Sequence, residues 1–375
     1  MLEEKGLVAD TKNLSISEEH STTAPSSRVS AEDTKPAYKA PPAGPISTPF
    51  PHPLPQNSTP QPTATLTPDQ EKKYNDLLST VSAWTEIPTT SSRWSKKEPI
   101  TEEERMWLTR ECLLRYLRAT KWTNSQAATR LLATLTWRRE YGLAKFTSDY
   151  ISPENETGKQ VILGFDNDAR PCLYLNPSKQ NTAKSDRQLH HLVYMLERVI
   201  DLMGPGQETT ALLINFNDSG SSSSVSVAQG RATLVILQGH YPERLGRALI
   251  SELPWYITTF FKFISPFIDP VTKSKMKFNE PLIDHVPAEQ LWRHYGGKAD
   301  FEYDHKTYWP ALDVLCQQRR TEYRTRWEKA GKKIGEHEEY LRGGAKKCSS
   351  GQYTGSDMPE GFTGGGVTTD KVPPV

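Results

Sequence analysis

The sequence has few of the residues from which metal centres and disulfide frameworks are built. Its four cysteines, Cys112, Cys172, Cys316 and Cys348, are widely spaced and form no CxxC pair. A structural zinc site or a disulfide framework is therefore not indicated, and a reducing cytosol suits the chain. His190 and His191 are adjacent, so they point to different faces of a helix and cannot easily ligate one ion. We expect a partly exposed histidine pair and no metal.

Motifs of catalysis are also missing. The sequence contains no GxSxG, HExxH or Walker motif, and the segment Gly204-Pro205-Gly206 lacks the third glycine and the following helix of a dinucleotide site. We expect a protein that is not an enzyme and needs no cofactor.

Neither an excess of charge nor a membrane-spanning run is present. The 46 Lys and Arg residues against 45 Asp and Glu give a formal net charge of +1. This predicts no general attraction to nucleic acid, so any anion site has to be local. No apolar run is long enough to cross a bilayer. The start, MLEEKGLVAD, lacks a basic segment followed by an apolar one, so we expect neither a signal peptide nor a lipid anchor, and only peripheral membrane contact.

The two ends of the chain differ in composition from its middle. Twelve of the 28 prolines lie in residues 25–68, among Ser, Thr and Ala, and Gly, Ser and Thr dominate from Gly343 onward. Such segments bury too little apolar surface to form a core. We expect a disordered arm over residues 1–66, dispensable for stability, and a disordered tail over residues 343–375.

The first part of the body predicts three helices, each opened by a threonine at the N-cap. Thr67 is followed by a proline in the first turn, and Thr101 and Thr123 are followed three residues later by Glu104 and Gln126, the spacing of a capping box. A glycine closes the third helix. The predicted ranges are 67–84, 101–117 and 123–142, which together form a small helical cap over residues 67–145.

After Phe146 short apolar runs alternate with helical ones, a pattern typical of an α/β fold with a mostly parallel sheet. The predicted strands are 161–165, 172–175, 211–216 and 247–250. The predicted helices are 188–203, 225–239, 255–267, 288–295 and 310–332. We expect a main domain over residues 146–310 and a C-terminal helix within residues 311–342.

The most distinctive stretch runs from Tyr241 to Lys275. Two polar motifs, YPER at 241–244 and DPVTKSK at 269–275, enclose a short apolar segment. Its aromatic residues occupy more of a helix than one amphipathic stripe requires, so this helix is either buried on all sides in a core or is a lid with a second apolar partner. These residues are Trp255, Tyr256, Phe260, Phe261, Phe263 and Phe267.

These two motifs, and the run from Leu113 to Gly142, resemble the CRAL-TRIO lipid-binding family, and within it the fungal phosphatidylinositol transfer proteins. The resemblance covers roughly residues 70–330. It implies a helical cap followed by a mostly parallel sheet flanked by helices, with an apolar lipid cavity closed by the lid helix. It also implies a cytoplasmic, monomeric protein that moves phosphatidylinositol between membranes, such as the endoplasmic reticulum, plasma membrane or lipid droplets, without making or breaking a bond.

The resemblance assigns the headgroup site residue by residue. Glu243 accepts bonds from inositol hydroxyls, Thr272 donates to phosphate, and Lys275 and Lys121 supply positive charge. Thr120 stands where close relatives carry an additional basic residue. Trp255, Phe260, Phe261, Phe263 and Phe267 form the lid and contact the acyl chains.

Each assignment has a plainer alternative. Glu243 and Arg244 could form a surface ion pair, Thr272 could serve only to start a helix, and Lys275 could be an ordinary exposed lysine. A lipid-loaded signalling or scaffold module without exchange, and a lipid hydrolase, also stay open as functions.

The resemblance bears on the second ligand as well. Family members that bind phosphatidylcholine carry two hydroxyl residues two positions apart on a central strand, where this chain has Thr210-Ala211-Leu212. We expect Leu212 to make phosphatidylcholine a poor ligand and the second ligand to be another lipid, such as a sterol.

Overall fold

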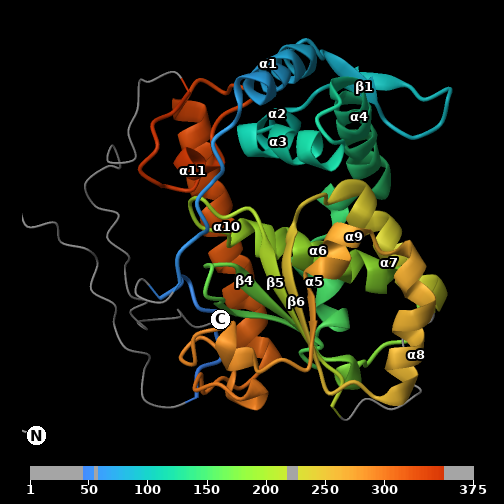
Figure 1. Ribbon diagram of the computed structural model, residues 1–375, viewed down its shortest axis with the longest axis vertical. Coiled ribbons are helices and arrows are strands. Elements are labelled where there is room, and N and C mark those ends of the chain that lie inside the picture. Colours follow the sequence, from blue (N-terminus) through green and yellow to red (C-terminus); the bar gives the residue numbers. More distant parts are fainter. Residues whose placement is uncertain (1–44, 55–57, 218–226, 350–375) are drawn as a thin grey trace, which may run out of the picture. The chain divides into compact units, whose positions relative to one another are not determined.

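A five-stranded sheet lies at the centre of the residues that the computed structural model describes, 45–54, 58–217 and 227–349 (Figure 1). All of them belong to one unit of the chain, residues 41–375. The strands follow one another across the sheet in sequence order; the first pair is antiparallel and the other pairs are parallel. They are β3 (Gln160–Phe165), β4 (Pro171–Leu175), β5 (Thr210–Asn215), β6 (Leu245–Ser251) and β7 (Met276–Phe278).

Helices cover both sides of this sheet. In the view of Figure 1, α7 and α8 lie to its right and α10 to its left. Helix α6 packs on β3 and β4, and α10 packs on α6. The helices of this part are α5 (Ser148–Ile151), α6 (Asp186–Asp201), α7 (Val227–His240), α8 (Trp255–Ile264), α9 (Pro270–Ser274), α10 (His305–Lys329) and α11 (Glu338–Leu341). The α/β fold with a mostly parallel sheet is thus confirmed.

The helical cap lies above the sheet in the same view and has a core of its own, with Leu77, Leu113 and Leu131 fully buried. Its elements are α1 (Pro68–Ser82), β1 (Glu86–Pro88), β2 (Lys97–Pro99), α2 (Glu102–Trp107), α3 (Arg110–Ala119) and α4 (Asn124–Tyr141). The capping boxes of Thr67 with Gln70 and of Thr101 with Glu104 both form. Gly142, with φ 73°, ends α4 as expected.

Two cap helices depart from the sequence prediction. The range 101–117 is two helices, because the chain breaks at Leu108 and Thr109 caps a new start by accepting a bond from the Cys112 amide. At this break the Leu108 carbonyl accepts a bond from the Gly335 amide of the C-terminal segment. The predicted capping box of Thr123 and Gln126 is wrong, because the Thr123 side chain makes no cap hydrogen bond.

Three further points differ from the sequence prediction. The range 288–295 is no helix beyond a 3-10 turn at Arg293–Tyr295, because its backbone pairs with the returning chain: the Lys298 amide donates to the Ala288 carbonyl and the Ala299 amide to that of Leu291. Helix α10 begins at His305, because Asp304 caps it. Strands β1, β2 and β7 were not predicted, being only three residues long each.

The ends of the body extend further than composition suggests. Ile46 pairs with the chain around Phe301, donating its amide to the Asp300 carbonyl at 2.7 Å, and Leu54 is buried. At the other end Cys348 is buried. Residues 45–54 and 343–349 therefore pack on the body, in contrast to the expected disordered arm and tail. Of the expected arm and tail, residues 1–44, 55–57 and 350–375 fall outside the described part.

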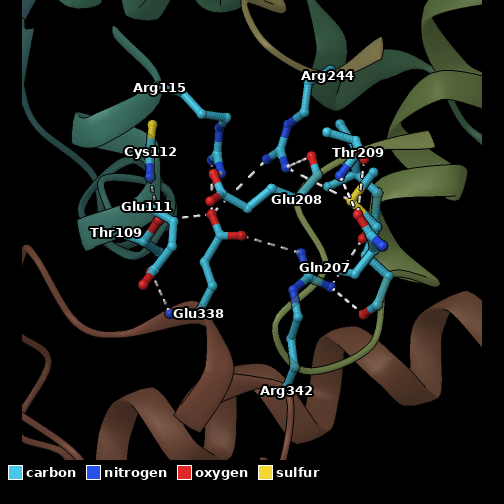
Figure 2. Close-up of polar contacts among 12 residues, drawn as sticks. Thr109, Glu111, Cys112, Arg115, Gln207, Glu208, Thr209, Arg244, Glu338 and Arg342 are labelled. Atoms are coloured by element: carbon cyan, nitrogen blue, oxygen red, sulfur yellow. Dashed lines mark hydrogen bonds and ion pairs between the residues drawn. The ribbon is translucent and has the colours of Figure 1, made fainter. Parts of the chain in front are cut away.

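A buried cluster of charges connects the cap, the sheet and the C-terminal segment (Figure 2). Arg115 of α3 donates to the Glu338 carboxylate at 2.7 Å and to the Glu208 carboxylate, in the loop before β5, at 2.9 Å. Arg244, in the turn before β6, donates to the Glu208 carbonyl at 2.9 Å. Arg342, just after α11, donates to the Met203 carbonyl at 2.7 Å and lies 3.9 Å from Glu338. We call Arg115, Glu208, Arg244, Glu338 and Arg342 the Glu338 cluster.

Guanidinium groups set the charge state of Glu338. Burial alone would raise the pKa of its carboxyl, but the charges of Arg115, Arg244 and Arg342 outweigh burial and hold that pKa well below its usual range. The carboxylate is therefore ionised at neutral pH and neutralises cations that have little access to water.

We expect Glu338→Gln to lower the free energy of unfolding by about 3 kcal/mol or more, because it leaves buried cations short of an anionic partner. Urea denaturation followed by circular dichroism measures the change. The adjacent Glu339→Gln, outside the cluster, serves as the control. Equal stability of the two variants would contradict the role given to the cluster.

Candidate functional site

The two polar motifs meet at one edge of the sheet. Glu243 lies two residues before β6 and Lys275 immediately before β7. Because these strands are parallel neighbours, the residues that precede them lie at the same edge. The Lys275 carbonyl accepts a bond from the Ala248 amide, and the Lys275 ammonium lies 3.7 Å from the Glu243 carboxylate. Both side chains remain partly exposed, so water or a polar ligand can reach them.

The residues on either side of Glu243 are fixed in the interior. The Tyr241 hydroxyl donates to the Glu197 carboxylate at 2.6 Å, and Glu197 also binds Arg138 of α4 at 2.7 Å. Arg244 belongs to the Glu338 cluster. The alternative of a surface ion pair between Glu243 and Arg244 is therefore wrong, since Arg244 is buried and has other partners.

Glu243 adopts a backbone conformation that is unusual for its residue type. Its φ of 58° is in the left-handed region, which costs a non-glycine residue about 1–2 kcal/mol. Lys121 and Trp122, directly after α3, share this conformation with φ values of 51° and 62°. Strained residues of this kind tend to occur at binding sites, where the surrounding structure holds them in place. Two of the predicted headgroup residues are thus among the strained positions.

Thr272 lies on α9, whose N-cap is Asp269. The Asp269 carboxylate accepts a bond from the Thr272 amide at 2.8 Å. Burial would raise the pKa of Asp269, but hydrogen bonds from the Thr272 hydroxyl and amide lower it. The Thr272 hydroxyl therefore also takes part in capping the N-terminus of α9. The Lys275 amide donates to the Thr272 carbonyl, so one turn of chain connects the two residues.

Thr120 and Lys121 are placed differently from each other. The Thr120 hydroxyl is buried and donates to the Tyr116 carbonyl at 2.9 Å, so its donor is already used. Lys121 is exposed. Within the described ranges, no hydrogen bond or ion pair joins either residue to Glu243, Thr272 or Lys275.

The segment 255–267 is a helix, α8, followed by the 3-10 turn Ser265–Phe267. Ile257 and Ile264 are buried and seat the helix, whereas Trp255 is 80% exposed and Phe263 is 65% exposed. Phe267 is also exposed, and its carbonyl accepts a bond from Gln238 of α7. Phe260 lies on the same helix, but its side chain is outside the described part. The helix is not buried on all sides, so the alternative of an ordinary core helix is wrong.

The sheet presents an apolar face toward this helix. Strand register aligns two rows of residues on one face, and the ring of Phe261 on α8 packs edge-on against Phe278 at 5.5 Å. Leu175, Leu212 and Ile214 in these rows are only half-buried. This apolar face is therefore incompletely covered by protein side chains. The rows are Leu173, Leu212, Ala248 and Met276, and Leu175, Ile214, Ile250 and Phe278.

Of the histidine pair, only His190 shows the expected partial exposure. His191 is buried, and burial lowers its pKa to about 3, so this ring is neutral. His190 bonds the Tyr150 hydroxyl at 3.0 Å. No cluster of His, Cys, Asp or Glu suited to a metal ion occurs among residues 45–54, 58–217 and 227–349. Over the same residues no helix has the length and apolar character to cross a membrane.

Comparison with known proteins identifies the family. The model of the CRAL/TRIO domain matches residues 155–297, and that of the CRAL/TRIO N-terminal domain matches residues 73–133. The chain belongs to the CRAL/TRIO family. The two matched ranges fall on the sheet with its helices and on the cap, which confirms the resemblance seen in the sequence.

Several fungal CRAL/TRIO relatives are similar over the same region. A CRAL-TRIO domain-containing protein of Schizosaccharomyces pombe is 54% identical over 279 residues, covering 74% of this chain and 28% of the relative. The phosphatidylinositol transfer protein PDR17 of Saccharomyces cerevisiae is 42% identical, covering 57% of this chain and 65% of the relative. The SEC14 cytosolic factor of Candida glabrata is 28% identical, covering 51% and 71%. The chain thus spans less than two thirds of the first two relatives.

Sequence reasoning did not identify which strand residues form the half-covered sheet face of this CRAL/TRIO domain, since the family resemblance implied only an apolar cavity beneath the lid helix. Ile214 and Phe278 lie 64 positions apart in the numbering and become neighbours of Ile250 only through strand register. An apolar strand residue gives no signal of whether its face will be covered. The pairing of Phe278 with Ile250 could be inferred only once β7 was known.

Replacing Glu243 by Gly and by Ala tests the strain at this position. Both changes remove the carboxylate, but glycine accepts a left-handed φ without the steric cost that alanine retains. We expect Glu243→Gly to be more stable than Glu243→Ala by about 1 kcal/mol in urea unfolding. At Glu98, which has no positive φ, the order should reverse, with Gly less stable than Ala. The same order at both positions would contradict strain at Glu243.

Proposed function

We propose that this protein binds phosphatidylinositol and moves it between membranes without chemical change. The observation that carries the proposal is the position of the Glu243–Lys275 pair, at the edge of a sheet whose apolar face is only half covered. A phosphoinositide needs an acceptor for ring hydroxyls, a cation for its phosphodiester and an apolar surface for its chains. The names of the relatives PDR17 and CSR1, both phosphatidylinositol transfer proteins, support this ligand.

In the proposed complex Glu243 accepts hydrogen bonds from the inositol ring and Lys275 binds the phosphate. Thr272 and Lys121 add contacts, and Thr120 has a weaker claim, because its hydroxyl already donates to the Tyr116 carbonyl. The acyl chains lie on the half-covered face beneath α8, next to Phe261 and Phe278. Helix α8 acts as the lid, and its exposed aromatic residues meet the bilayer when lipid enters or leaves.

The energetics of exchange follow from burial. About thirty methylenes at about 0.8 kcal/mol each leave the bilayer interior and enter the protein, so the loss and the gain nearly cancel. The barrier then lies in moving the lid. We place this monomeric protein in the cytoplasm with transient contact to membranes such as the endoplasmic reticulum, plasma membrane or lipid droplets, and with a sterol or another lipid as second ligand.

We expect Lys275→Ala to reduce transfer of labelled phosphatidylinositol between vesicles about tenfold or more, because a charge-assisted bond worth about 1.5–3 kcal/mol is lost. Lys277→Ala is the matched control: this lysine, two residues along the chain, pairs with Glu280 at 3.6 Å on the surface. Equal loss in both variants would contradict the headgroup site. Tight lipid binding without transfer by the unmodified protein would favour a lipid-loaded signalling module instead.

Ligand choice is tested at Leu212. A choline phosphate that lacks a hydroxyl partner is left short of one hydrogen bond, a deficit of about 1–3 kcal/mol. We expect the unmodified protein to transfer phosphatidylcholine poorly, and Leu212→Thr to raise this transfer more than it changes that of phosphatidylinositol. Ile214→Thr, on the same face two residues along β5, is the control. Equal transfer of both lipids by the unmodified protein would refute the role of Leu212.

A further inference from the structure

A β-hairpin projects from the cap and carries an exposed tryptophan. Strands β1 and β2 pair antiparallel, with Ile87 opposite Glu98, and the loop between them contains Trp94. This side chain is 86% exposed, and the only ring contact recorded for it within the described ranges is the Arg93 guanidinium, 5.4 Å from its centre. The function proposed above makes no use of this residue.

The base of the hairpin is firmly attached to the cap. Ile87 is fully buried in the cap core. Arg139 of α4 donates to the carbonyls of Ile87, at 3.0 Å, and Pro99, at 2.8 Å. The neighbouring Glu140 accepts a bond from the Ser91 amide at 2.9 Å. Trp94 is therefore exposed on a loop that the cap holds in place, and its side chain contributes nothing to the core.

Basic residues surround the tryptophan. Arg93, Lys96 and Lys97 are all exposed, and the acidic residues of the hairpin are Glu86 and Glu98, the latter 3.3 Å from Lys96. Tryptophan prefers the boundary between water and lipid, where its ring is apolar and its N–H stays wet. Lysine and arginine are attracted to the negative surface of an anionic bilayer. This combination fits a negatively charged membrane surface.

The hairpin and the lid can reach one flat surface together. In Figure 1 the loop that follows β1 and the helices α7 and α8 both extend to the right-hand limit of the described chain. A flat surface that stands perpendicular to the page along the right-hand side therefore touches the loop and the helices, at whatever depth in the view each of them lies. Helix α8 carries the exposed side chains of Trp255 and Phe263.

We propose that the β1–β2 hairpin is a second membrane contact, in which Trp94 enters the interface of an anionic bilayer and Arg93, Lys96 and Lys97 bind its headgroups. Two separated contacts fix the orientation of the protein on the surface, which a single lid cannot do. The inference does not depend on which lipid the protein carries, because the hairpin lies on the cap and shares no residue with the headgroup site.

Sedimentation of the full chain with vesicles tests this contact. The vesicles contain phosphatidylcholine with about 30 mol% phosphatidylserine, or phosphatidylcholine alone. We expect Trp94→Ala to weaken binding to the anionic vesicles about threefold or more. The triple change of Arg93, Lys96 and Lys97 to Gln should weaken it about tenfold or more, and added salt should reduce the difference.

Two variants away from the hairpin, on α10 and in the segment that directly follows it, provide matched controls. Val314→Ser removes an exposed apolar side chain, and Lys306, Lys329 and Lys333 changed together to Gln remove the same charge as the hairpin triple. Binding by the hairpin variants equal to that of these controls would overturn the proposal. Transfer of phosphatidylinositol reports on the headgroup site and sedimentation with vesicles reports on the hairpin, so failure of the one and failure of the other are distinguishable.

Discussion

The buried carboxylate of Glu338 joins three parts of the chain that are distant in sequence. It accepts a bond from Arg115 in the cap and lies 3.9 Å from Arg244, the last residue of the YPER motif. Charges with little access to water tolerate few arrangements, because each needs its partner in place. Arg244 is thereby fixed on one side of Glu243, and Tyr241, bound to Glu197, is fixed on the other. The left-handed conformation of Glu243 is held between these two anchors.

Strand pairing explains why two motifs some thirty residues apart lie together at one edge of the sheet. Between them the chain runs along β6 and then leaves the sheet to form α8; the second motif contains α9 and leads into β7 beside β6. Parallel pairing then places the residues before both strands at one edge. This connection contains α8, the lid of the proposed function, so the proposed movement of α8 would occur next to the charged pair without breaking the strands that position it.

The sequence predicted the cap, four of the five central strands and the lid helix, since each depends on local signals such as the Thr67 cap, the apolar run 161–165 and the aromatic segment 255–267. It did not predict β7 or the break at Leu108, because both depend on distant partners: β6 for the strand, and Gly335 for the free carbonyl of Leu108. The proximity of Glu243 and Lys275 came from family resemblance, and only strand register gives it a physical reason. The half-covered face and the hairpin with Trp94 left no sequence signal, because exposure is decided by what the fold leaves uncovered.

The distribution of exposed apolar groups bears on how a lipid could enter. Ile257 and Ile264 seat α8 on the body, whereas Trp255 and Phe263 face outward. In water, exposing such side chains is unfavourable, and lifting the helix would expose the sheet face as well. At a bilayer both surfaces find apolar surroundings, so the free energy of opening falls only there. In the proposed function, a lid built in this way opens where a lipid can be exchanged and stays closed in solution, which couples exchange to membrane contact without any chemical signal.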